Sequence, residues 1–285
     1  MQAHNTFNIS RLLCYLECPK KAFWRYIENI EPVRDEPPKA INFGSAIHEG
    51  LAAGYMAGFN NDQVLTATLD AFHDHYVGDE QRDYGVAMLE KYWEKFSGDF
   101  DEWEIVGAEL GFEGQLPHWD TDVPPTILGR PDLIIRTEDN RVFNVQHKTV
   151  GHSVGLDTYV EAYDLHWHEL SYAMLVQPLL REGDVFAGSI LNLLRKTKVP
   201  SYARFYLPIH DHLVNEFYED AAEVIYRWQT GKFVKNPGSC RKWNSLCPYY
   251  QKCLGQAFGQ WEYTSREPDY VDERNNREVE GTETT

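Results

Sequence analysis

Residues 129–150 read GRPDLIIRTEDNRVFNVQHKTV, and this stretch decides the fold. The runs on either side of TEDNR (137–141) are short and rich in β-branched and apolar residues, as strands are. TEDNR itself is a cluster of turn-forming residues, which favours a tight connection between neighbouring antiparallel strands. We therefore expect a β-hairpin here.

The second strand of this hairpin carries the candidate chemistry. Side chains alternate across a strand, so Gln146 and Lys148 point to one face and His147 to the other. Asp132 lies on the adjoining strand and can face the same way as Lys148. An oxygen-rich cluster suits Mg²⁺ or Mn²⁺, and a neighbouring lysine suits activation of water or stabilisation of charge on a phosphate. The plain alternative is that Asp132 closes a turn and Lys148 is a solvated strand residue, because short motifs often match by chance.

Helical and strand-like segments surround the hairpin in an order typical of a mixed α/β domain. A helix after Ser10, broken near Cys18 by Pro19, is followed by a Pro-rich polar loop over 30–43. Further helices are expected at about 45–58, 62–77, 84–97, 157–181 and 210–230. Strands are expected at 103–116, 126–136, 142–150, 186–196 and 202–209, and the first three would form an antiparallel meander.

Composition bounds the class of protein. The 285 residues are 42% hydrophobic and 14% aromatic, which supports a buried core. No apolar run approaches the roughly eighteen residues of a membrane span, and the first residues lack the layout of a signal peptide, so we expect a cytoplasmic protein without membrane contact. The net charge of −17 argues against a protein that coats nucleic acid indiscriminately, although a local basic groove is compatible with it.

The hairpin motif resembles that of a known family. The pattern G-x-P-D, with Gly129 and Asp132, followed by x-x-K-T over 146–149, looks like the PD-(D/E)XK nuclease superfamily, in particular its RecB-like branch. That branch includes CRISPR-associated RecB-like iron–sulfur exonucleases and their viral relatives, so the resemblance implies a viral or prokaryotic source. It also implies a restriction-endonuclease-like core with a central mixed sheet flanked by helices and an N-terminal helical insertion.

Other family marks can be matched residue by residue. A G-x-x-x-H helix before the sheet, whose histidine ligates metal in the family, is matched by Gly44 and His48. Glu109 matches an acidic residue on the first strand that contacts the metal or the lysine. The Q-x-x-x-Y helix after the lysine strand is matched by Tyr172, but His168 replaces the glutamine.

The resemblance implies a metal site and a set of catalytic residues. His48, Asp132 and the oxygen of residue 146 would hold Mg²⁺ or Mn²⁺ with the backbone carbonyl of His147, while Lys148 stabilises the charge of the transition state. Gln146 departs from the family, which has Asp or Glu at this position. An amide oxygen can ligate a hard cation but carries no charge, so we expect a weaker metal site.

The cysteines predict a second metal centre. Five occur, Cys14 and Cys18 near the start and Cys240, Cys247 and Cys253 near the end; an odd number in an intracellular chain disfavours a disulfide framework. The iron–sulfur relatives imply a [4Fe–4S] cluster on Cys18, Cys240, Cys247 and Cys253. Structural Zn²⁺ is the competing interpretation, although the spacing differs from that of zinc ribbons. Cys14 is expected to pack, with replacement of Cys18 as the alternative.

The resemblance also suggests how the chain is organised. It implies a single nuclease domain over 1–261, with a helical region at about 44–99, a core at about 103–230 and an iron–sulfur segment at 240–253 that closes onto Cys18. Residues 262–285 are acidic and poor in apolar residues, so we expect a disordered tail.

Three function classes follow. The first is a metal-dependent DNA exonuclease, preferring single strands, that leaves a 5′-phosphate and serves DNA processing, recombination or CRISPR-type adaptation with protein partners. Basic residues at 195–198 and at Lys20, Lys21 and Arg25 could guide the DNA, and aromatic side chains could stack on its bases. The second is a catalytically weakened DNA-binding or adaptor protein, favoured by Gln146. The third is a structural iron–sulfur protein in which the strand motif is coincidental.

Overall fold

A computed structural model describes residues 5–33, 39–58, 61–76, 78, 81–117, 119, 123–152, 155–161, 163, 165–242, 245–255 and 263–265. The chain forms two compact units, one of residues 1–35, 113–129 and 216–285 and the other of residues 36–112 and 130–215. Within the described residues, no helix is long and apolar enough to cross a membrane.

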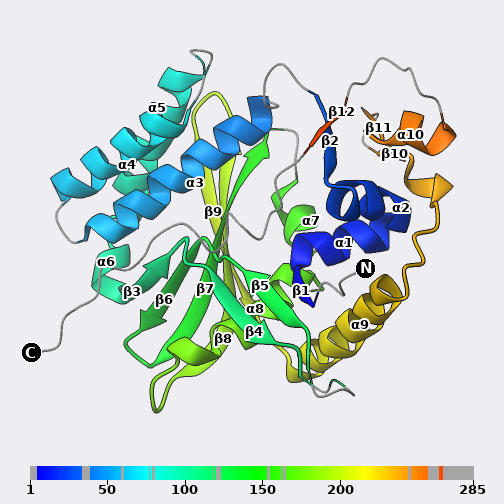
Figure 1. The fold of residues 1–285 in the computed structure, drawn as a ribbon. Helices are drawn as coiled ribbons and strands as arrows, with labels where there is room; N and C mark the ends of the chain where they lie inside the picture. The colour runs from blue at the N-terminus through cyan, green and yellow to red at the C-terminus, as the bar shows by residue number, and fades with distance from the viewer. Residues whose placement is uncertain are drawn as a thin grey trace, which may run out of the picture. The chain divides into compact units, whose positions relative to one another are not determined.

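The second unit is built on a five-stranded mixed sheet (Figure 1). Its strands, in spatial order, are β3 (Trp103–Ala108), β6 (Leu133–Thr137), β7 (Arg141–Gly151), β8 (Val185–Lys196) and β9 (Ser201–Pro208). The pair β7–β8 is parallel and the other pairs are antiparallel. The mixed α/β fold with this sheet is consistent with the restriction-endonuclease-like core expected.

The expected hairpin is confirmed as β6 and β7. Leu133 pairs with Val145 and Arg136 with Val142, and the turn between the strands includes Asn140 at a φ of 60°. This left-handed conformation is one that asparagine adopts more easily than most residues. The local sequence therefore sets the register that brings the start of β6 beside the middle of β7.

Helices cover both faces of the sheet. On one face lie α3 (Lys39–Ala57), α4 (Asn61–His75), α5 (Arg82–Phe96) and α6 (Asp99–Glu102), of which α3, α4 and α5 are grouped together (Figure 1). Leu133 and Val145 point into the core under these helices, whereas Ile134 and Val142 pack against α8 (Trp167–Leu175) on the opposite face. Burial on both faces explains the nearly unbroken apolar runs of the central strands.

Three expected elements are divided in the structure, and one is the strand expected at 126–136, whose two halves are β5 (Thr126–Gly129) and β6 in different sheets. The strand expected at 103–116 is two strands, since β3 ends at Ala108 and β4 (Phe112–Gln115) joins β5 and β1 (Thr6–Asn8) in a separate sheet ordered β1-β5-β4. The expected meander therefore holds only for β3, β6 and β7. The helix expected at 157–181 is divided into α7 (Leu156–Glu161) and α8, with a 3₁₀ turn at Gln177–Leu179 where Pro178 cannot continue the hydrogen-bond ladder.

The first unit starts with a broken helix, as expected, but its cap differs. Helix α1 (Ile9–Glu17) is capped by Asn8, whose side chain accepts a 2.8 Å hydrogen bond from the Arg11 amide, so the expected cap at Ser10 is wrong. The helix ends at Cys18, and α2 (Pro19–Ala22) and a π-helical turn (Phe23–Ile27) follow. The remaining elements of this region are β2 (Ile30–Pro32), α9 (Asp211–Gln229), the 3₁₀ turn Pro237–Ser239, β10 (Arg241–Lys242), β11 (Ser245–Leu246), α10 (Tyr250–Leu254) and β12 (Tyr263–Ser265).

Parts of the expected loop and the start of the expected tail carry structure. The loop expected over 30–43 includes β2 and the start of α3, where Phe43 is packed in the core. The disorder expected for 262–285 is wrong for β12, because its backbone pairs with that of β2. The rest of the tail lies outside the described residues.

Candidate metal and active site

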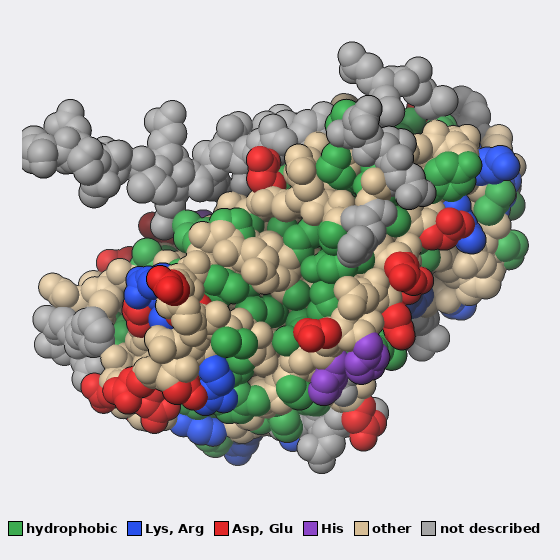
Figure 2. Space-filling view, turned by 90° about the horizontal axis from the view of Figure 1, so that it is seen from below, with side chains coloured by type: hydrophobic (Ala, Val, Ile, Leu, Met, Phe, Trp, Pro, Cys, Tyr) green, Lys and Arg blue, Asp and Glu red, His purple; other side chains and the backbone are tan. Residues whose placement is uncertain are grey.

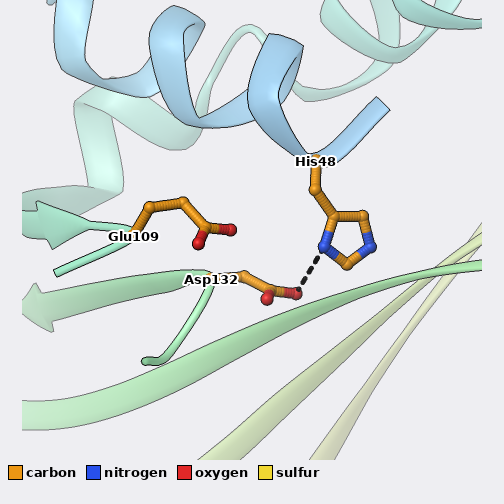
Figure 3. Close-up of side chains that lie close together, drawn as sticks. All are labelled: His48, Glu109 and Asp132. Carbon is orange, nitrogen blue, oxygen red and sulfur yellow. Dashed lines mark ion pairs between the residues drawn. The ribbon is translucent and has the colours of Figure 1, made fainter. Parts of the chain in front are cut away.

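Three side chains from separate elements meet above the start of β6. His48 comes from α3, Asp132 directly precedes β6, and Glu109 follows the last residue of β3 (Figure 3). One potential ligand atom from each lies within 4.8 Å of the others. Carboxylate oxygens and a neutral imidazole suit a divalent cation, so this group could hold the metal that the sequence predicts.

Asp132 is the centre of the group. It is 9% exposed, and one of its oxygens accepts a 2.6 Å hydrogen bond from the His147 amide and lies 3.4 Å from His48 Nδ1. Burial alone would raise the pKa of Asp132, but the charges of His48 and Lys148 outweigh burial and hold it below its ordinary value. Asp132 is therefore ionised at neutral pH.

Glu109 supplies the second carboxylate. Its backbone φ is 50°, unusual for a residue with a side chain, and its amide donates to the Asp132 carbonyl over 3.1 Å. Burial and the charge of Asp132 raise the pKa of Glu109 to about 7, while Arg130 lies 2.9 Å away and opposes the rise. A bound cation would relieve the repulsion between these carboxylates. The sequence placed Glu109 on the strand, whereas it lies directly after β3.

Lys148 and Gln146 share one face of β7, as alternation predicts. Lys148 Nζ donates to the Gln146 amide oxygen over 3.1 Å. The Gln146 amide nitrogen lies 3.2 Å from Asn144 Oδ1 and 3.4 Å from the Tyr172 hydroxyl, which in turn donates to the Arg130 carbonyl over 3.3 Å. Tyr172 thus lies beside Gln146.

His147 points to the opposite face, as expected. Its ring stacks on Tyr55 at 5.9 Å and lies 3.0 Å from Asn192 Nδ2. Burial lowers its pKa to about 3, so the imidazole is neutral. Only the backbone of His147 therefore faces Asp132, and ligation by its carbonyl stays a prediction.

Helix α8 contributes residues that the sequence analysis missed. Glu169 is 6% exposed and accepts a 3.0 Å hydrogen bond from Asn144 Nδ2. Burial raises its pKa to about 7. Its position three residues before Tyr172, on the same helix face, and the position of Asn144 two residues before Gln146 were the available signals. His168 occupies the family's glutamine position, and its Nδ1 lies 3.3 Å from Nδ1 of His166. Burial lowers the pKa of His168 to about 3.

The basic residues expected to guide DNA are partly engaged elsewhere. Lys196 lies 4.0 Å from the centre of the Phe43 ring and donates to Gln81, and Arg195 donates to the His152 carbonyl. In the first unit, Lys20 lies over the Phe23 ring. These contacts leave their role in DNA binding a prediction. In the view of Figure 2, the Lys and Arg side chains that the structure describes lie among acidic ones.

The C-terminal cysteines and Cys18 surround one cavity in the first unit. Cys18, Cys240, Cys247 and Cys253 line this cavity of about 190 Å³. Four thiols from distant parts of the sequence thus line one cavity, and the group that they would hold stays a prediction. Cys14 is buried and is not among the described residues that line the cavity, and burial raises its pKa to about 11.

Comparison with known proteins gives the family. The model of the PD-(D/E)XK nuclease superfamily matches residues 6–254. The crystal structure of SSO0001 is similar at 13% identity and a TM-score of 0.36, covering 82% of this chain and 84% of that chain. A crystal structure of an exonuclease candidate from Eubacterium rectale is similar at 12% identity and a TM-score of 0.49, covering 90% of each chain. No curated protein sequence matches. Because the family match spans most of the sequence, the chain belongs to the PD-(D/E)XK nuclease superfamily.

Proposed function

We propose that this protein is a deoxyribonuclease that hydrolyses phosphodiester bonds with Mg²⁺ or Mn²⁺. The superfamily supports a nuclease-type function on a nucleic-acid substrate. The observation that carries the proposal is the meeting of His48, Glu109 and Asp132 within 4.8 Å, with the charge of Lys148 acting on Asp132. A buried cluster of opposite charges with strongly shifted pKa values is typical of a functional site.

Each residue has a role in this proposal. Asp132, His48 and Glu109 would hold the cation, with the Gln146 oxygen and the His147 carbonyl as further ligands. When bound, the cation would supply Lewis-acid activation of the phosphate and of water. Lys148 stabilises negative charge that develops on the phosphate. Tyr172 supports the Gln146 amide rather than the phosphate itself, since its hydroxyl lies 3.4 Å from that amide.

The finer assignment follows the family resemblance. We place the protein in the RecB-like branch as an exonuclease that prefers single-stranded DNA and acts in the cytoplasm, or in the host cytoplasm for a viral protein. Its setting would be recombination, DNA processing or CRISPR-type adaptation together with protein partners. Basic residues at 195–198 would guide the strand toward the sheet.

The test is cleavage of end-labelled DNA with Mn²⁺ at pH 8. Wild type is compared with Lys148→Ala and with Lys91→Ala, which removes a lysine of α5 outside the site. We expect Lys148→Ala to lose about 100-fold or more of the cleavage rate, as when an electrostatic contact to the transition state is lost, and Lys91→Ala to keep it. Equal rates in all three proteins would contradict the site. Product lengths on single and double strands then decide polarity and strand preference.

A second candidate is a catalytically weakened DNA-binding or adaptor protein. The observation that favours it is Gln146, an uncharged residue whose amide is already bonded to Asn144, Tyr172 and Lys148. This function predicts DNA binding that persists in Lys148→Ala while wild type fails to cleave at any Mn²⁺ concentration. Fluorescence anisotropy with the same labelled DNA measures that binding.

For the cysteine cavity we propose a [4Fe–4S] cluster held by Cys18, Cys240, Cys247 and Cys253, with structural Zn²⁺ as the alternative. In support, these four thiols line one cavity and Cys14 does not. A cluster of this kind links the two ends of the chain within the first unit. We expect anaerobically purified wild type and Cys14→Ser to be brown and Cys240→Ser to be colourless. Colourless wild type with bound zinc by elemental analysis would favour the alternative.

A further inference from the structure

A line of polar side chains leads from α8 to the candidate active site. Asn144, Gln146 and Lys148 occupy alternate positions of β7 and so share a face, and Glu169 approaches them from α8. Asn144, Gln146 and Glu169 are buried. The separations along the line are 3.0 Å from Glu169 to Asn144, 3.2 Å from Asn144 to Gln146 and 3.1 Å from Gln146 to Lys148.

Lys148, at one end of the line, sets the direction of every hydrogen bond in it. An ammonium can only donate, so Lys148 requires the oxygen of the Gln146 amide. The Gln146 nitrogen must then donate to the Asn144 oxygen, which turns the Asn144 nitrogen toward Glu169. Asn144 Nδ2 donates to a Glu169 oxygen, which completes the line in the same direction. Asn144 Nδ2 also lies 3.2 Å from the Ser189 hydroxyl.

We propose that Glu169 is a positioning residue that acts through Asn144 to hold the Gln146 oxygen toward Lys148, and that this line requires an amide at position 146. Its importance for cleavage rests on the proposed nuclease function, whereas the direction of the hydrogen bonds does not. Gln146 is then the residue that this environment demands. The departure from the family's Asp or Glu is coupled to Asn144 and Glu169.

A carboxylate at position 146 would break the line. Its oxygen would face the Asn144 oxygen, and two acceptors without a hydrogen between them leave buried groups unsatisfied. If the Asn144 amide turned over, its oxygen would instead face Glu169. A glutamine at position 169 removes the conflict, because its amide can donate to the turned Asn144. Gln146→Glu therefore needs Glu169→Gln as its partner.

The experiment is a double-mutant cycle of these two substitutions, measured by thermal unfolding at pH 8 without divalent metal. We expect Gln146→Glu to lower Tm by at least about 3 °C and the double variant to recover most of that loss. Glu169→Met is the matched control, since it removes the same charge and cannot donate. Combined with Gln146→Glu it should not restore Tm. Recovery with methionine equal to that with glutamine would overturn the proposal, because charge alone would then explain the effect.

A second measurement separates this inference from the proposed function. The Mn²⁺ concentration that gives half-maximal cleavage should be lower in the double variant than in wild type, because the added carboxylate brings the negative charge that the Gln146 amide lacks. If the Tm cycle shows the expected coupling but no variant cleaves DNA, the hydrogen-bond line stands and the nuclease function fails. If wild type cleaves and the Tm effects of the two substitutions simply add, the line is wrong and the nuclease function stands.

Discussion

The carboxylates Asp132 and Glu109 carry opposite pKa shifts although both are largely buried. Asp132 receives an amide hydrogen bond and lies near His48 and Lys148, which keep it ionised. Burial and the charge of Asp132 both disfavour the ionised form of Glu109, so its pKa rises to about 7. A metal-free site thus carries one firm negative charge and one that is shared with a proton. A divalent cation would displace that proton on binding.

Glu169 allows a prediction about stability and pH. Burial raises its pKa from 4.5 to about 7, so the folded protein binds this proton more tightly than the unfolded chain does. Its contribution to the free energy of unfolding is therefore full below pH 4.5 and falls by at most about 3 kcal/mol as the pH rises to about 7. In urea titrations from pH 5 to 8, the free energy of unfolding of wild type minus that of Glu169→Gln should decrease as the pH rises. A constant difference would contradict the shift.

At the scale of elements, α3 must lie close to its neighbours to carry His48 over the sheet. Two glycines of this helix allow the approach. A Cβ at Gly50 would come within 2.9 Å of the Thr68 carbonyl in α4, and one at Gly54 would overlap both the Thr68 hydroxyl and the Trp93 ring in α5. Trp93 also donates a 2.9 Å hydrogen bond to Thr68, which fixes the contact between α4 and α5. Small residues here set the position of the helix that bears the imidazole.

Gly54→Ala should therefore destabilise the second unit. The added methyl group cannot be accommodated without moving Trp93 or Thr68, and we expect a loss of about 1–3 kcal/mol in the free energy of unfolding. Gly98→Ala is the control, since that glycine has a φ of −75° and open space around its Cβ position. Urea unfolding of both variants measures the loss. If both unfold like wild type, the packing inferred for α3 is wrong.

The break in the chain between α7 and α8 determines which residues of α8 face the site. His166 is extended, with a φ of −78° and a ψ of 121°, so a new helix starts at Trp167 after the end of α7. The restart places Glu169 and Tyr172 on the side that faces β7, where they contact Asn144 and Gln146. A single continuous helix over 157–181 would have turned other residues toward β7.

For the whole molecule, the net charge of −17 limits how a nucleic-acid substrate can approach. Long-range attraction cannot come from the overall charge, and in the view of Figure 2 the described Lys and Arg side chains are interspersed with Asp and Glu. Binding would then depend on the cation at the site and on local contacts. A small number of phosphate contacts would give a weak dependence of DNA affinity on salt.

Metal binding should stabilise the whole protein. A cation that binds only the folded site raises the free energy of unfolding by about 2.7 kcal/mol when its concentration is 100 times Kd. We expect Mn²⁺ to raise the Tm of wild type and to leave the Tm of Asp132→Asn unchanged. The control is Asp101→Asn, which changes an exposed acidic residue of α6 and should respond like wild type. Thermal scans across a Mn²⁺ titration measure this. Equal shifts in all three proteins would place the cation elsewhere.

The sequence by itself determined the elements whose signals are local. The hairpin of β6 and β7 follows from a turn cluster between two β-branched runs, and alternation correctly assigned Gln146 and Lys148 to one face and His147 to the other. The helical periodicity of α3, α4, α5 and α9 was likewise sufficient, apart from their ends. The family motif added Asp132, His48 and Glu109 as candidates, but no local signal stated that they would meet.

Only the tertiary structure decided where these residues lie and how they ionise. Contacts between distant segments bring His48 and Glu109 to Asp132, and burial sets the pKa of Glu109 and Glu169 near 7. The break before α8 and the separate sheet of β4 and β5 also depend on such contacts. The physical reason is that desolvation, ion pairing and hydrogen-bond direction arise from neighbours in space, which sequence periodicity does not specify.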